Sequence, residues 1–77
     1  MWKEENNTLT RTYKFKDFVA AFAFMSKVAL VAERMNHHPT LTNTYNTVHI
    51  TLTTHDAGNT VTALDRALAE AIDALQD

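Results

Sequence analysis

Apolar and polar residues alternate along two segments of the chain, residues 9–16 and residues 48–55. In both segments every second side chain is mainly apolar or aromatic, and the side chains between them are mainly threonine, lysine or histidine. A period of two is typical of a strand that buries one face. We predict two further strands, a short one over residues 2–5 and the first strand of a hairpin that spans residues 40–54.

Two other segments repeat their apolar residues at helical spacing. Asp17 is a candidate N-cap for a helix that should end near Met35, and Thr62 with Asp65 resembles a capping box before a second helix. The predicted buried stripe of the first helix is Phe18, Phe22, Met25, Ala29 and Ala32. That of the second is Leu64, Leu68, Ala71, Ile72 and Leu75.

The predicted order is therefore strand, strand, helix, strand, strand, helix. Paired strands separated by helices favour an α+β fold, ββαββα, in which helices cover one face of a four-stranded antiparallel sheet. The chain has 77 residues with one glycine, one proline and no linker-like segment, which predicts a single domain over residues 1–77.

Composition narrows the functional classes. The net charge is −2 without a basic block, so nucleic acid is not an expected partner. The absence of cysteine removes disulfides and thiolate chemistry, and the longest apolar run, residues 19–25, is too short to span a bilayer. We expect a cytoplasmic protein without a membrane partner, and the small size favours self-association.

Three of the four histidines lie in two short motifs, Asn36-His37-His38-Pro39 and Thr53-Thr54-His55-Asp56. A hairpin that turns at Asn46-Thr47 would place His55 opposite His38. A cluster of three imidazoles indicates either proton-transfer catalysis or a metal site. Pro39 should send the adjacent histidines in different directions, which disfavours a three-histidine zinc site, so we expect no metal.

Residues 33–39 (Glu-Arg-Met-Asn-His-His-Pro), Tyr45-Asn46, Val48 and residues 53–58 (Thr-Thr-His-Asp-Ala-Gly) together resemble the pterin-4a-carbinolamine dehydratase family. The similarity extends over nearly the whole chain, and from it we expect the fold to lack the N-terminal helix of the family. It departs at Leu41, where relatives often carry an aromatic residue, and at residues 59–61 (Asn-Thr-Val), where many carry Gly-Leu.

The resemblance implies dehydration of 4a-hydroxytetrahydropterin to quinonoid dihydropterin during tetrahydrobiopterin recycling, with no cofactor and in a homodimer or homotetramer. It implies that His37 and His55 transfer protons and that His38 orients the pterin. The expected substrate-binding residues are Glu33, Asn36, Thr53, Thr54 and Asp56. Glu33 precedes His37 by one helical turn and could contact that histidine or the amino group of the pterin.

Two alternatives accompany this hypothesis. The same fold could serve as a non-catalytic module that binds or assembles a protein partner. The histidines at the helix end could also be stabilised only by the helix dipole. We expect His49 to lie on the surface away from the other histidines, and Trp2 to cover the core.

Overall fold

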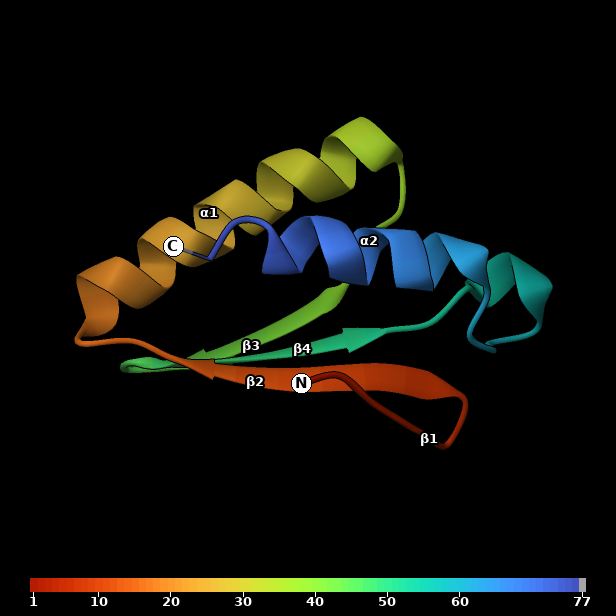
Figure 1. Ribbon diagram of the computed structural model, residues 1–77, viewed down its shortest axis with the longest axis horizontal. Coiled ribbons are helices and arrows are strands. Elements are labelled where there is room, and N and C mark those ends of the chain that lie inside the picture. The colour runs from red at the N-terminus through yellow and green to blue at the C-terminus, as the bar shows by residue number, and fades with distance from the viewer. Residues whose placement is uncertain (77) are drawn as a thin grey trace.

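The computed structural model describes residues 1–76, so Asp77, the last residue of the expected domain, lies outside the described residues. Its elements are β1 (Lys3–Glu5), β2 (Thr8–Lys14), α1 (Phe18–Met35), β3 (Thr40–Thr44), β4 (Thr47–Leu52), a 3₁₀ turn η1 (His55–Ala57) and α2 (Ala63–Asp73). The strands form one antiparallel sheet in the order β1-β2-β4-β3, and both helices lie on the same side of it (Figure 1). The predicted α+β fold is confirmed.

The hairpin between β3 and β4 has a different register from the predicted one. Thr44 pairs with Thr47, so the turn is at Tyr45-Asn46, and the Asn43 side-chain amide stabilises it by donating to the Thr47 carbonyl at 2.9 Å. The ladder begins at Thr40 and ends before the histidine motifs, so the predicted pairing of His38 with His55 is wrong. A shift of two residues leaves every side chain on its predicted face of the sheet.

Helix α1 begins and ends where the sequence predicted. The Asp17 carboxylate accepts a hydrogen bond from the Ala20 amide at 2.8 Å, and Asn36 ends the helix in a left-handed conformation with φ 53°. The predicted buried stripe is partly wrong, because Phe18 and Phe22 are 47% and 53% exposed. The buried residues of α1 are Ala21, Phe24, Val28, Val31 and Ala32.

The error has a physical cause. Apolar residues surround most of α1, so helical spacing alone admits more than one stripe. Packing against the sheet decides between them, because the Phe24 ring meets the Tyr13 and Phe15 rings at centroid distances of 4.8 and 5.0 Å.

Helix α2 begins with the predicted capping box between Thr62 and Asp65. Leu68 and Ile72 are fully buried, as predicted, and they pack in the same core as Val48, Ile50 and Leu52 of β4. Leu64 is an exception, since it is 53% exposed at the first turn of the helix.

A polar cluster joins the N-terminal strands to the end of α2. One Asp73 carboxylate oxygen accepts hydrogen bonds from the Trp2 indole at 3.0 Å, the Arg11 guanidinium at 2.8 Å and the Tyr13 hydroxyl at 2.5 Å. Trp2 also packs against the edge of the core, as predicted. Strands and helix that are distant in sequence are therefore held together at this corner.

Tyr13 makes stability sensitive to alkaline pH. Burial, followed by the hydrogen bond and charge of Asp73, raises the pKa of the Tyr13 phenol above its ordinary 10.0 against the opposing effect of Arg11. The unfolded chain releases this proton near pH 10 while the folded chain keeps it. The stabilisation is therefore complete below pH ~10 and is lost as the pH rises toward the folded pKa.

We expect the free energy of unfolding to fall more steeply between about pH 9 and about pH 11 in the wild type than in Tyr13→Phe. Urea denaturation across this range measures the difference. Equal slopes for the two proteins would contradict the prediction.

Candidate active site

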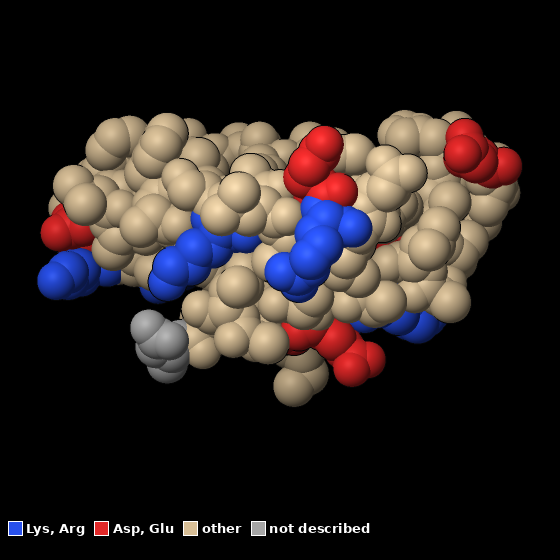
Figure 2. Space-filling model, turned by 90° about the horizontal axis from the view of Figure 1, so that it is seen from above, with Lys and Arg blue, Asp and Glu red and all other residues tan. Residues whose placement is uncertain are grey.

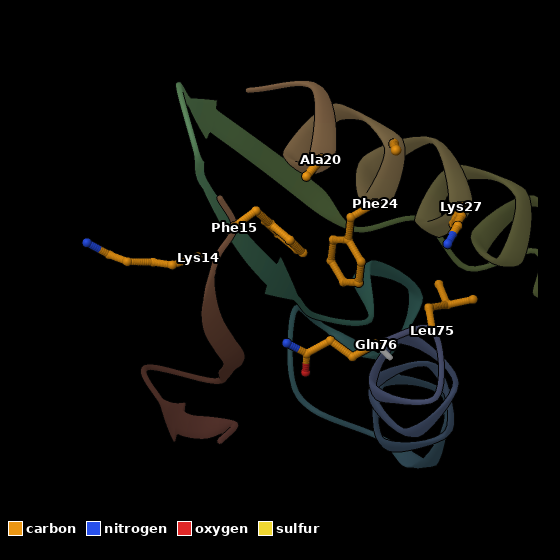
Figure 3. A pocket seen from close by; sticks show the side chains of 8 residues that line it. Lys14, Phe15, Ala20, Phe24, Lys27, Leu75 and Gln76 are labelled. Carbon is orange, nitrogen blue, oxygen red and sulfur yellow. The ribbon is translucent and has the colours of Figure 1, made fainter. Parts of the chain in front are cut away.

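One hollow on the surface does not carry the predicted chemistry. It has a volume of about 410 Å³ and lies between the end of β2, the first half of α1 and the end of α2. Phe15, Phe24 and Leu75 line it, and the Lys14 side chain points away from it (Figure 3). None of its described lining residues is a histidine, an aspartate or a glutamate, and the predicted acid-base groups lie in another pocket.

A second pocket, of about 250 Å³, holds the histidine motifs. Its lining residues come from the end of α1, the segment after β4, and the first turn of α2. They are Asn36, His37, His38, Thr53, Thr54, His55, Asp56 and Leu64. The structure thus brings together seven of the eight residues predicted for the site and adds Leu64, which the helical pattern had assigned to the core.

The chain reaches this pocket through two breaks in regular structure. At the end of α1, the left-handed Asn36 lets the His37 amide bond back to the Ala32 carbonyl at 3.1 Å, so the chain leaves the helix at once. After β4, the η1 turn ends at Gly58 with φ 84°, a conformation that suits glycine. Both breaks direct histidines toward the same end of the molecule.

His37 is held by a buried carboxylate. Its Nε2 lies 2.6 Å from Asp65 Oδ1, and the side chains are 11% and 0% exposed. The other Asp65 oxygen accepts hydrogen bonds from the Thr54 hydroxyl at 2.7 Å and from the Thr62 amide at 2.8 Å. Sequence reasoning treated Asp65 only as a capping residue and missed this contact.

Asp65 remains ionised despite its burial. Burial alone raises the pKa of this carboxyl, but hydrogen bonds from His37, Thr54 and the Thr62 amide outweigh it and hold the pKa below 3.8. A carboxylate only accepts hydrogen bonds, so His37 donates through Nε2 and keeps Nδ1 for another partner. Thr54 supports this pair, since its hydroxyl is already committed to Asp65.

Glu33 contacts a different histidine from the predicted one. Its carboxylate accepts from His38 Nε2 at 2.9 Å, and the two side chains are 80% and 60% exposed. The expected contact with His37 is wrong, because the left-handed turn at Asn36 takes His37 inward to Asp65. Glu33 does not line the pocket, and such an exposed pair adds little stability.

His55 is oriented by a neutral residue. Its Nδ1 lies 2.6 Å from the Asn59 side-chain oxygen, a contact that the sequence did not predict. The fourth histidine lies apart: His49 is exposed on the open face of the sheet and bonds to Thr12 at 2.8 Å. In each of the three pocket histidines, one ring nitrogen is therefore hydrogen-bonded to a side-chain oxygen. This arrangement suits groups that exchange a proton through the other nitrogen.

No three histidine, cysteine, aspartate or glutamate side chains within residues 1–76 gather in a way that could hold a metal ion. Neither helix in this part of the chain is long and apolar enough to cross a membrane.

The sequence model of the pterin 4 alpha carbinolamine dehydratase family matches residues 1–75. The chain belongs to this family. A relative from Prochlorococcus marinus, provisionally named pterin-4-alpha-carbinolamine dehydratase, is 53% identical over 74 residues, which cover 96% of this chain and 77% of the relative. A Synechococcus protein with the same provisional name is 55% identical, with coverage of 96% and 78%.

Solved structures of the dehydratase family share the fold. A crystal structure described as a transcriptional coactivator/pterin dehydratase from Brucella melitensis superposes with a TM-score of 0.91 at 44% identity, covering 99% of this chain and 82% of that one. A pterin dehydratase-like protein identified as a RuBisCO assembly factor in the α-carboxysome has a TM-score of 0.78 at 24% identity, with coverage of 97% and 86%. At that identity the second similarity concerns the fold alone.

Proposed function

We propose that this protein dehydrates 4a-hydroxytetrahydropterin to quinonoid dihydropterin by histidine acid-base catalysis, in the cytoplasmic recycling of tetrahydrobiopterin. The observation that carries the proposal is the His37–Asp65 couple, which lies in one pocket with His38 and His55. Membership of the dehydratase family supports the substrate class.

The reaction needs two proton transfers. The C4a–O bond breaks as the departing hydroxide takes a proton and leaves as water, and a ring nitrogen of the pterin loses a proton. A histidine can serve as acid or base near neutral pH, and each positioned group typically contributes about 10²–10⁴-fold. No redox step or covalent intermediate is required, so the proposed reaction needs no cofactor.

The remaining pocket residues have proposed binding roles. Asn36, Thr53 and Asp56 line the pocket with polar groups that can hydrogen-bond the amino and carbonyl edge of a pterin. Leu64 offers an apolar surface beside them, which suits one face of the bicyclic ring. Glu33 would act through His38, to which it is hydrogen-bonded.

Binding of a pterin in this pocket can be tested without catalysis. A stable dihydropterin should shift the imidazole NMR signals of His37, His38 and His55 and leave those of His49 unchanged, because His49 lines a different hollow, next to Arg11 and Thr12. Saturable binding that moves none of the three pocket histidines would contradict the proposal. Absence of binding by a folded protein would favour the non-catalytic binding module.

We also propose that the protein forms a homodimer or homotetramer through the outer face of α1. Phe18, Val19, Phe22 and Leu30 are exposed there by 47%, 75%, 53% and 73%. Figure 2, which looks down on the helices, shows continuous uncharged areas on this face, with Lys, Arg, Asp and Glu side chains across its middle and at its ends. Apolar area of this kind is costly to leave in water and is typical of an interface.

Phe22→Glu is expected to shift the protein from an assembly to the monomer, because burial of a new unpaired charge opposes association. Sedimentation velocity at micromolar concentration measures the change, with Thr12→Glu on the opposite face of the sheet as the control. A wild type that sediments as a monomer would contradict this assignment.

A further inference from the structure

In the loop that follows β4, the side chain of an asparagine contacts His55. Asn59 has a left-handed backbone with φ 58°, and its side-chain oxygen accepts from His55 Nδ1 at 2.6 Å. Asn59 does not line the pocket, whereas His55 does. The Asn59 side chain would therefore influence a bound molecule through the imidazole that it contacts.

The backbone holds this pair in place. The Thr54 carbonyl accepts from the amides of Ala57 at 3.3 Å and Asn59 at 3.1 Å, and the Thr54 amide donates to the Thr60 carbonyl at 3.0 Å. The Gly58 amide bonds to the His55 carbonyl at 3.0 Å. Residues 54–60 thus form a loop closed by backbone hydrogen bonds, and this loop holds the side chains of His55 and Asn59 in contact.

The chemistry of the contact selects a tautomer. An amide oxygen accepts hydrogen bonds and cannot donate, so the proton of neutral His55 lies on Nδ1 and the lone pair lies on Nε2. The partners of the other two pocket histidines are carboxylates, Asp65 for His37 and Glu33 for His38. Of the three, His55 is the one whose hydrogen-bond partner is uncharged.

We propose that Asn59 is a positioning residue that fixes His55 as the Nδ1–H tautomer, so that Nε2 is the nitrogen that accepts the substrate proton. This deepens the proposed dehydratase function and rests on it for the identity of the proton donor. The tautomer itself does not depend on that function and can be observed in the free protein.

Asn59→Gly is the decisive variant, because glycine keeps the left-handed backbone and removes the amide. Asn6→Gly makes the same chemical change at φ 52° in the turn between β1 and β2 and serves as the matched control. ¹⁵N chemical shifts of the imidazole, recorded at about pH 8.5 where an ordinary histidine is neutral, report which nitrogen carries the proton.

We expect wild type and Asn6→Gly to show His55 protonated on Nδ1, and Asn59→Gly to show a mixture with Nε2–H. Asn59→Asp retains an acceptor oxygen and should restore the single tautomer. A wild type protonated on Nε2, or an Asn59→Gly protein with the wild-type tautomer, would overturn the proposal.

The dehydration assay then tests the role of Asn59 separately from the proposed dehydratase function. Loss of one neutral hydrogen bond should lower kcat by about threefold to tenfold in Asn59→Gly and leave KM unchanged. The predicted tautomers in a protein that accelerates no dehydration would support the positioning role and reject the proposed reaction. An unchanged kcat in an active Asn59→Gly enzyme would reject the role of His55 Nε2.

Discussion

Replacing His37 with glutamine is expected to lower kcat for dehydration of 4a-hydroxytetrahydropterin by about 10²–10⁴-fold, the usual contribution of one positioned acid or base. Glutamine can still donate a hydrogen bond to the buried Asp65 carboxylate, so the fold should survive. It cannot exchange a proton near neutral pH. Single-turnover rates on freshly generated substrate measure the loss directly.

The fourth histidine provides the control for this experiment. His49→Gln makes the same chemical change on the open face of the sheet, where the histidine contacts Thr12 outside the pocket, and should retain the wild-type rate. A His37→Gln protein within about threefold of the wild type would show that His37 contributes no proton transfer.

Replacing Asp65 with alanine is expected to lower the free energy of unfolding by about 3–5 kcal/mol, because three donors lose their acceptor and each buried donor left unpaired typically costs about 1–3 kcal/mol. His37, Thr54 and the Thr62 amide all donate to this carboxylate, and its side chain is fully buried. The loss also removes half of the capping box of α2. Urea denaturation followed by circular dichroism measures the change.

Asp65→Asn removes the charge of the side chain and keeps its size and shape. Because the folded pKa of Asp65 lies below the ordinary 3.8, its ionisation stabilises the fold at pH values above 3.8, and this is lost as the pH falls through the lowered pKa. We expect the acid-induced loss of stability to be shallower in Asp65→Asn than in the wild type. Identical acid profiles would show that the pair with His37 does not hold the carboxylate ionised.

The sequence predicted the fold well because local patterns determine most of it. The period of two in residues 9–16 and 48–55 identified the faces of β2 and β4, and Asp17 and Thr62 marked the starts of the helices. The hairpin register was harder to predict, because it depends on which two residues form the turn. Tyr45 adopts a positive φ in this turn, which its residue type does not indicate.

The rotation of α1 could not be predicted from spacing. Its apolar residues occupy several faces, and contact of Phe24 with Tyr13 and Phe15 selects the face that is buried. Phe18 and Phe22, assigned to the core from the sequence, instead contact each other at the surface with their ring centroids 5.8 Å apart.

The members of the pocket could be predicted from the sequence, but the partners of the histidines could not. His37, His38 and His55 belong to motifs that are visible in the chain. Asp65 is separated from His37 by 28 residues and already had a local explanation as a capping residue. Asn59 was visible only as a departure from the family pattern, and the fold of residues 54–60 brings its side chain to His55.

The most direct test of the proposed function is the rate at which freshly generated 4a-hydroxytetrahydropterin loses water with and without the wild-type protein, in the presence of a metal chelator. We predict a protein-dependent acceleration that the chelator does not reduce and that the His37→Gln protein lacks. A folded wild-type protein that leaves the spontaneous rate unchanged would contradict the dehydratase function and favour a binding or assembly role, whereas an acceleration abolished by chelator would contradict catalysis by the histidines alone.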